Sequence, residues 1–477
     1  MKSIYNFLNT KVFMALVALV SFASCSESFP DAVDSTGNQT VLKSIKIINA
    51  GGQGNVVSVG VIDEQKKTIS FPRIDPKSNL AGLKFEITSS DGSKLERESY
   101  DFGFTEGDTE KTLIIKLTNG PRFRDYFATV RLMVPVYGGD FTKPTFYDYT
   151  PNEIGNPIYG PFVGGTVRGT GFNGEYVFIV DRNGNAPHLL RVSDLKQNKI
   201  DPIYLNNTGI VGGTFTLHSG AMVKDHIYAA NLSGGQTSPL KIYHWTDPKA
   251  APTIIADINV AQIPNAGVRH GDNMSVSLDD AGNGFIFFGD NAGTKILRFS
   301  VTNYTTINNP TVFAMPVTGA GSWTSYNRVG NTDEYLFTGH DAPIYIMNAN
   351  GQSAYNMART AIPVRGSDAR VFYFNGERYL LMLTAARTGS EATVLYVYNI
   401  TRGTTTAEAI RLFETESDKK AIFEYSLLGA VNGNPTTQTG FYVKKDAQGN
   451  DESLLLYGST FAAGFVVVEI PKKQLED

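Results

Sequence analysis

The densest group of chemically capable side chains in the sequence is the run Arg269-His270-Gly271-Asp272-Asn273. It combines a guanidinium, an imidazole, a carboxylate and an amide, which offer directional donors and acceptors for sugar hydroxyls. His270 and Asp272 are also of the types that act as a general acid and base. The competing interpretation is a polar turn whose side chains bond neighbouring backbone. We take this run as the first candidate for ligand binding.

Similar polar residues recur where hydrophobic runs end or begin in the C-terminal three quarters of the chain. Loops on one face of a rigid β scaffold commonly carry binding residues. Each residue alone is more simply explained as closing a turn, but several loops aimed at one channel favour a ligand site. Trp323 adds a flat apolar surface on which a pyranose ring could stack. The full predicted set is Asp181, Arg182, His218, Asn231, Arg269, His270, Asp272, Asp290, Trp323, His340, Asp341, Arg365, Asp368 and Arg387.

Motifs that would identify an enzyme are missing from the sequence. There is no G-x-S-x-G elbow, no H-E-x-x-H and no phosphate-binding G-x-x-x-x-G-K-[ST]. We therefore assign no catalytic residue, no cofactor and no metal, although three histidines from different loops are of a type that binds metal: His218, His270 and His340. A glycoside hydrolase or polysaccharide lyase stays open as an alternative, because paired carboxylates are available from Asp181, Asp272, Asp290, Asp341 and Asp368.

Six strand–loop–strand pairs position these residues, with first strands that begin near Tyr176, Ile227, Phe285, Tyr335, Tyr379 and Leu454. Most of the intervals roughly fit the 40–50 residues of one propeller blade. The longer final interval indicates an insertion around 413–439, or a divergent seventh blade between 412 and 439. The pattern predicts a six-bladed β-propeller over 161–472. Residues 137–160 are expected to form a linker, with a strand around 146–158 that closes the ring.

The segment before the propeller is predicted to contain a targeting signal and a spacer domain. Residues 1–24 have the charged start and short apolar stretch of a signal peptide. Cys25, the only cysteine, stands where a lipoprotein signal is cleaved and lipidated, so 25–40 is predicted as a lipidated tether. Short alternating strands over 41–136 predict an Ig-like β-sandwich. The predicted fold class is therefore all-β, an N-terminal Ig-like sandwich followed by a six-bladed propeller.

Composition excludes several classes of protein. The chain has 42 Lys+Arg against 46 Asp+Glu, and this net charge of −4 without a basic run argues against nucleic-acid binding. A single cysteine excludes a disulfide scaffold and cysteine-based metal sites.

Three stretches carry a family resemblance: VGGTVRGTGFNGEYVFIVD, RHGDNMSVSLDDAGNGFIFFGD and VRGSDARVFYFNGERYLLMLT. Together with the lipobox and the sandwich, they resemble Bacteroidota outer-membrane lipoproteins of the DUF4623 type. The resemblance implies an outer-membrane location and a role in glycan utilisation, and it supplies no catalytic residues. We expect a lipid-anchored protein facing outside the cell that binds an oligo- or polysaccharide through the propeller loops without catalysis. An outer-membrane transporter is the expected partner, and an adhesion scaffold is the third alternative.

Overall fold

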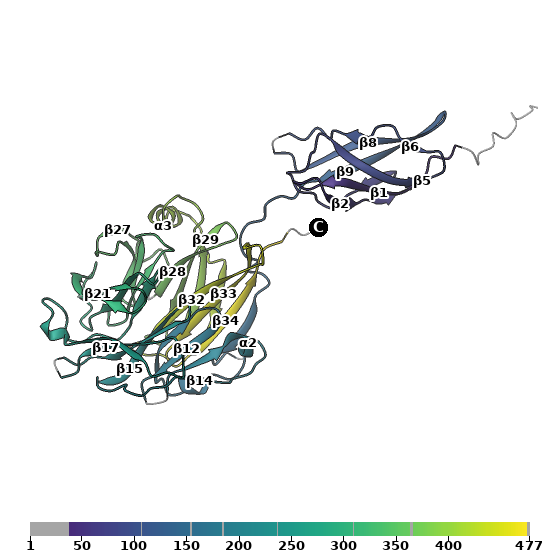
Figure 1. Ribbon diagram of the computed structural model, residues 1–477. Helices are drawn as coiled ribbons and strands as arrows, with labels where there is room; N and C mark the ends of the chain where they lie inside the picture. The colour runs from purple at the N-terminus through teal and green to yellow at the C-terminus, as the bar shows by residue number, and fades with distance from the viewer. Residues whose placement is uncertain are drawn as a thin grey trace, which may run out of the picture. The chain divides into compact units, whose positions relative to one another are not determined.

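The computed structural model describes residues 38–474 except 106, 153–154, 184–185, 236, 309 and 363–365. The predicted signal peptide, Cys25 and most of the tether lie outside this range. Among the described residues, no helix is long and apolar enough to cross a membrane. Strands are the main regular secondary structure of the described residues, and the chain divides into two units, Met1–Pro135 and Val136–Asp477 (Figure 1).

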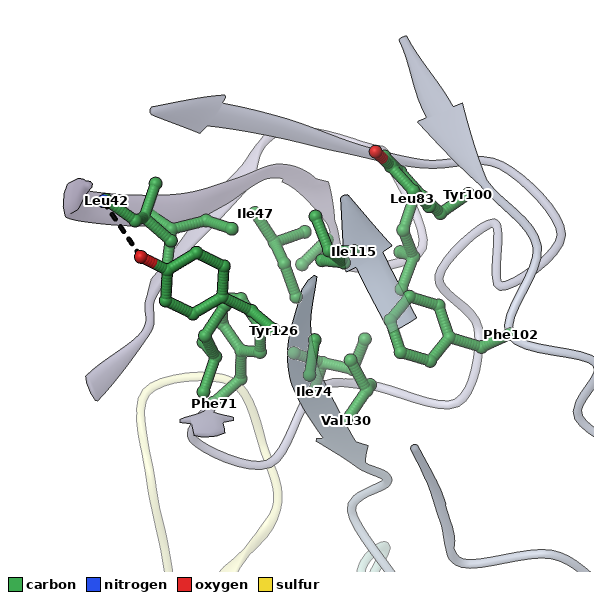
Figure 2. Close-up of a cluster of buried hydrophobic side chains, with 14 of the residues drawn as sticks. Leu42, Ile47, Phe71, Ile74, Leu83, Tyr100, Phe102, Ile115, Tyr126 and Val130 are labelled. Carbon is green, nitrogen blue, oxygen red and sulfur yellow. Dashed lines mark hydrogen bonds between the residues drawn. The ribbon is translucent and has the colours of Figure 1, made fainter. Parts of the chain in front are cut away.

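The first unit is a β-sandwich with one hydrophobic core. Buried and exposed residues alternate along much of its long strands, so one face of each sheet turns inward. Tyr126 and Phe71 pack into this core, and the Tyr126 hydroxyl accepts a hydrogen bond from the Leu42 amide at 3.0 Å (Figure 2). One sheet has the order β2-β1-β5-β7 and the other β3-β4-β9-β8-β6. The strands are β1 (Leu42–Ala50), β2 (Val56–Val59), β3 (Val61–Asp63), β4 (Thr68–Ser70), β5 (Leu83–Ser89), β6 (Lys94–Leu95), β7 (Ser99–Tyr100), β8 (Glu110–Asn119) and β9 (Arg122–Arg131).

The second unit repeats a small antiparallel sheet in which neighbours in sequence pair with each other. The predicted strand pairs are the second and third strands of these sheets, and another strand precedes each pair. In chain order, the first sheet contains β11 (Val167–Phe172), β12 (Tyr176–Asp181), β13 (His188–Arg191) and β14 (Ile203–Tyr204), and the second contains β15 (Phe215–Val223), β16 (His226–Leu232), β17 (Leu240–Trp245) and β18 (Thr253–Ile258). The third contains β19 (Ser275–Leu278), β20 (Gly284–Gly289), β21 (Lys295–Thr302), β22 (Thr306–Ile307) and β23 (Thr311–Ala314). The fourth contains β24 (Thr324–Arg328), β25 (Tyr335–Gly339), β26 (Ala342–Met347) and β27 (Ser353–Asn356), and the fifth contains β28 (Gly366–Phe374), β29 (Glu377–Thr384), β30 (Val394–Asn399) and β31 (Phe423–Ser426).

The last sheet joins the two ends of this unit. Its strands are β32 (Thr437–Lys445), β33 (Asp451–Thr460), β34 (Gly464–Pro471) and, from the opposite end of the unit, β10 (Thr145–Tyr149). β10 pairs antiparallel with β34, with Tyr147 opposite Val467. The segment that we expected to close the ring therefore contains a strand in that position.

The first strands of the sheets contact one another in a closed order: β11, β15, β19, β24, β28, β32 and back to β11. This ring gives the unit its β-propeller-like fold (Figure 1). Gly169 permits the closest approach within it, because a Cβ there would lie 2.5 Å from the backbone nitrogen of Gly220 on β15.

The extra length near the end of the fifth repeat does not form another sheet. Residues 412–439 are all described, and they comprise the end of helix α3 (Thr406–Glu414), strand β31, a loop and the start of β32. The Thr405 side chain caps α3 by accepting a hydrogen bond from the Glu408 amide at 3.1 Å. The other short helices among the described residues are α2 (Val192–Leu195) and the single 3-10 turns Gly160–Phe162 and Val260–Gln262.

Candidate functional site

A group of basic and aromatic side chains gathers where the first strands begin and the second strands end. Because the strands of each sheet alternate in direction, these points lie at one end of the ring. We call the group the arginine cluster. It comprises Arg168, Arg182, Phe215, His218, Arg269, Asp272 and Phe461.

Arg168 is the most deeply buried arginine of the cluster, with 9% of its surface exposed. It lies on β11, and its guanidinium sits 3.8 Å from the ring centre of Phe461, within the range of a cation–π contact. Nη1 donates a hydrogen bond of 2.8 Å to the Asn434 carbonyl. Nε is buried and has no hydrogen-bond partner. A buried donor without a partner is costly, so this atom is a natural contact for a ligand.

Arg182 and His218 flank the aromatic ring of Phe215. The Arg182 guanidinium lies 4.7 Å from the centre of that ring, and the His218 ring stacks on it with centroids 5.8 Å apart. Arg182 Nε and His218 Nδ1 are buried and without partners. His218 itself is 4% exposed. Two polar atoms from neighbouring sheets are thus left unsatisfied beside the same ring.

The third arginine of the cluster is paired. Arg269 Nη2 lies 2.9 Å from one Asp272 oxygen and 3.1 Å from the other, and 37% of its side chain is exposed. Burial raises the pKa of Asp272, while the positive charges of Arg269 and Arg168 oppose that rise. The predicted run 269–273 therefore contributes an ion pair to the cluster.

The electrostatic environment of the cluster is positive. Burial, together with the smaller effect of the Arg182 charge, lowers the pKa of Arg168 to about 10, while the charge of Asp272 opposes this change. Burial and the charges of Arg168, Arg182 and Arg269 lower the pKa of His218 to about 3. His218 is therefore neutral at physiological pH, and its ring can accept or donate a hydrogen bond.

This depressed pKa predicts a pH dependence of folding stability. The unfolded chain takes up a proton at His218 near pH 6.5, whereas the folded chain resists protonation down to about pH 3. Unfolding therefore binds a proton in this window, and stability falls as the pH drops below 6.5. Replacing His218→Gln should reduce the acid-induced loss of stability by about 3 kcal/mol at about pH 4.5. Urea unfolding of the wild type and the variant at a series of pH values from 7 downward measures this difference. If the free energies of unfolding of the two proteins fall in parallel as the pH drops, the predicted burial of His218 is contradicted.

A second ion pair at this end of the ring joins two other repeats. Arg387 Nη1 lies 2.7 and 2.6 Å from the two oxygens of Asp341, and its Nε donates to the Gly433 carbonyl at 3.0 Å. His340 lies beneath this pair, with Nε2 3.7 Å from an Asp341 oxygen. The loop that holds Gly433 and Asn434 contacts both this pair and Arg168, so it separates the two groups.

Four predicted ligand residues hold the scaffold together. Asn231 accepts a hydrogen bond from the Lys241 amide, and Asp181 accepts one from the Asn183 amide. Asp290 accepts from the Thr294 amide, the Thr294 hydroxyl and the Lys295 amide. Asp368 accepts bonds from two other inner strands. The turn-closing interpretation describes Asn231, Asp181 and Asp290 better than ligand binding does. Asp368 instead links neighbouring inner strands.

The proposed stacking surface of Trp323 does not fit the structure. Its side chain is 2% exposed, and Nε1 donates a hydrogen bond of 3.0 Å to the Thr437 carbonyl across the ring. A sugar cannot reach an indole enclosed in this way. His270 is also fully buried, and neither ring nitrogen has a partner. Arg365 lies outside the described residues.

The three histidines do not form a metal site. His218 belongs to the arginine cluster, His340 to the second ion pair, and His270 is enclosed. Across the described part of the chain, no group of three His, Cys, Asp or Glu side chains could hold a metal ion.

Sequence reasoning missed Arg168, Phe215 and Phe461. Arg168 lies near the start of its inner strand, as His218 does in the next repeat. This equivalent position in the repeat could have identified Arg168 as a candidate. Phe461 lies in the turn between β33 and β34, and nothing local distinguishes it from an ordinary turn residue.

A cavity of about 190 Å³ lies between the inner strands. Gln438 reaches across it from β32: its Nε2 donates to the Gly220 carbonyl at 2.9 Å, and its Oε1 accepts from the Thr170 amide. Asn273, which follows Asp272, has a buried side-chain oxygen without a partner at the cavity wall. Polar groups therefore line part of this cavity, as Gln438 and Asn273 show.

The closed order of inner strands defines an all-β protein with a β-propeller-like fold and a cluster of basic side chains at one end. Its sequence matches the DUF4623 family model, described as a domain of unknown function, over residues 27–473. A crystal structure of a DUF4623 family protein from Bacteroides eggerthii DSM 20697 is 40% identical, with a TM-score of 0.74, and the match covers 92% of this chain and 99% of that chain. The chain belongs to the DUF4623 family, which confirms the predicted resemblance.

Other similarities are more distant. The structure of YCF48 bound to D1 peptide has a TM-score of 0.32 and 10% identity, and the match covers 77% of this chain and 90% of that one. A quinonprotein alcohol dehydrogenase-like protein from Bacteroides thetaiotaomicron VPI-5482 has a TM-score of 0.32 and 11% identity, with 66% and 88% covered. No curated protein matches the chain.

Proposed function

We propose that this protein binds an oligo- or polysaccharide, without catalysis, at the arginine cluster. The observation that carries the proposal is the set of buried, unpartnered polar atoms beside aromatic rings. Arg168 Nε, Arg182 Nε and His218 Nδ1 lack partners next to Phe461 and Phe215. Polar groups that orient a ligand, placed beside apolar surface, are typical of small-ligand sites.

The architecture that presents this site is also part of the proposal. We infer that the six small sheets are the blades of a six-bladed propeller closed by β10, and that the first unit is an Ig-like spacer. Closure through a strand from the other end of the unit supports the first inference. The two packed sheets of the first unit support the second.

The proposed location rests on the N-terminal sequence. The signal-like residues 1–24 and Cys25 support a lipid anchor in the outer membrane, with the propeller facing outside the cell. In this arrangement the protein would capture glycan and pass it to an outer-membrane transporter. Mass spectrometry of the membrane-extracted protein tests the anchor, because lipidation would leave Cys25 as an acylated N-terminus.

A glycan array on the purified protein tests the binding function. The comparison is the double variant Arg269→Ala/Asp272→Ala, which removes both members of the ion pair and so leaves the net charge of the cluster unchanged. We expect specific binding to be lost, because the pair borders the unpartnered donors. The matched control is Arg131→Ala/Glu110→Ala, which removes the Arg131–Glu110 ion pair of 2.7 Å from the first unit. This control should bind as the wild type does.

The outcomes separate the candidate functions. Binding that survives the Arg269/Asp272 double variant would contradict the proposed site. Each positive glycan is then incubated with the protein and its products analysed, and cleavage would favour a hydrolase or lyase. An array without any binding would favour a protein-interaction scaffold.

A further inference from the structure

We propose that the glycan recognised at the arginine cluster is acidic, and that Arg168, Arg182 and His218 bind an oxyanion carried by one of its sugars. The oxyanion is a carboxylate, as in a uronic acid, or a sulfate ester. This inference rests on the proposed function, and it adds the substrate class.

The balance of charge supports an anionic ligand. The cluster holds three guanidinium groups and one carboxylate, and Asp272 is already paired with Arg269. The charge of Arg182 acts unfavourably on Arg168, which is more than nine-tenths buried. Like charges held together at low exposure are costly without a counterion. An incoming anion would remove this cost, whereas a neutral sugar would leave it in place.

The free hydrogen-bonding atoms also suit an oxyanion. Arg168 and Arg182 each keep a buried Nε without a partner, and guanidinium groups bind carboxylate and sulfate oxygens through paired N–H donors. The side chain of Arg182 makes no hydrogen bond with any other described residue, so none of its N–H groups is committed elsewhere. His218 Nδ1 supplies a further group beside it. A sugar hydroxyl also donates a hydrogen bond and therefore needs an acceptor. Of the three atoms without partners, the two arginine Nε atoms only donate, and only the histidine nitrogen could accept.

The aromatic contacts hold the arginines ready for this role. Phe461 lies under the Arg168 guanidinium and Phe215 lies beside that of Arg182. Each ring restricts its arginine without using the N–H groups at the edge of the guanidinium plane. Pre-orientation of this kind reduces the entropy lost on binding.

Isothermal titration calorimetry with three oligosaccharides of equal length tests the inference. The probes are an oligogalacturonate, a sulfated oligosaccharide and a neutral oligoglucoside. We expect an acidic probe to bind at least about tenfold more tightly than the neutral one. The two acidic probes distinguish carboxylate from sulfate ester. Added salt should weaken the preference, because it screens the arginine charges.

Two variants and a matched control locate the effect. Arg182→Met keeps contact with Phe215 but removes the charge, and Arg168→Gln removes the buried guanidinium. Each should reduce the affinity for the acidic probe about tenfold or more. Arg298→Gln is the control. Arg298 also has a buried, unpartnered Nε, a phenylalanine ring at 4.6 Å and a bond to a backbone carbonyl, that of Ala349, but it lies outside the cluster.

Arg182→Met should have the melting temperature of the wild type, because the substitution breaks no hydrogen bond. A loss of affinity in this variant can therefore not be attributed to loss of the folded structure. Equal binding of acidic and neutral probes, lost in Arg269→Ala/Asp272→Ala, would overturn the acidic preference and leave glycan binding intact. An acidic preference that survives both arginine variants would overturn the assignment of the site. Failure of all three probes, together with a silent array, would overturn the proposed function itself.

Discussion

Replacing Asp368→Ala is expected to lower the free energy of unfolding by about 3–5 kcal/mol, the typical cost of removing one member of a buried charged network. Asp368 is 2% exposed and lies on β28. Oδ1 accepts a bond of 2.8 Å from Asn327 on β24. Oδ2 accepts a bond of 2.5 Å from the Thr439 amide on β32 and lies 3.5 Å from Arg370 Nη2. One carboxylate thus connects three neighbouring inner strands.

The backbone at this position adds to the cost. Asp368 has a φ of +47°, in the left-handed region that aspartate tolerates better than alanine. The strand pairing of β28 with β29 is irregular between Ser367 and Arg370, so the residue sits in a bulge. Asp368→Asn keeps the shape and the tolerance of this φ, and it should cost less than half as much as alanine.

Urea unfolding of the three proteins measures these differences. The matched control is Asp446→Ala, since Asp446 also accepts several hydrogen bonds but lies in an accessible turn. That change should leave stability close to the wild-type value. If Asp368→Ala lies within about 1 kcal/mol of the wild type, the carboxylate does not hold the ring together.

Gly169→Ala should destabilise the protein by about 2–3 kcal/mol and weaken ligand binding at the same time. A Cβ at this position would lie 2.5 Å from the Gly220 nitrogen and 2.7 Å from the Ser219 carbonyl carbon. Both are backbone atoms of β15, so no side-chain rotation relieves the clash. The two inner strands must therefore move apart. Arg168 and His218 are next to the clashing residues on these strands, so they would be displaced as well.

Thermal unfolding and calorimetry with the acidic probe measure the two effects of Gly169→Ala. Gly389→Ala is the control, because a Cβ there has no atom within 4 Å. It should change neither quantity. Loss of stability without loss of affinity would show that the separation of β11 and β15 does not set the geometry of the arginine cluster.

Much of the fold follows from local patterns in the sequence. The hydrophobic runs that begin near Tyr176, Ile227 and Phe285 are β12, β16 and β20. These strands are buried on both faces, so they read as continuous apolar segments. The all-β class was accessible for the same reason. The closing strand was accessible because the last repeat ends near Ile470, with too little chain left for a fourth strand.

The sequence allowed only part of the site to be predicted. Arg182, His218, Arg269 and Asp272 were predicted because polar residues at strand ends are visible in the sequence, but so were Asp290 and Asp368. Nothing local separates the two groups. Asp290 has backbone donors four and five residues away, whereas Asp368 finds its donors on strands 41 and 71 residues distant.

By itself, the sequence determined the β elements, the family and the polar character of the strand ends, because side-chain periodicity and motifs are properties of neighbouring residues. Only the tertiary structure decided which strand ends meet. It placed Arg168 against Asn434, 266 residues away, and against the ring of Phe461. It also enclosed Trp323 under the backbone of Thr437. Closing a ring of sheets brings distant residues together and buries others, and burial determines which donors are left for a ligand.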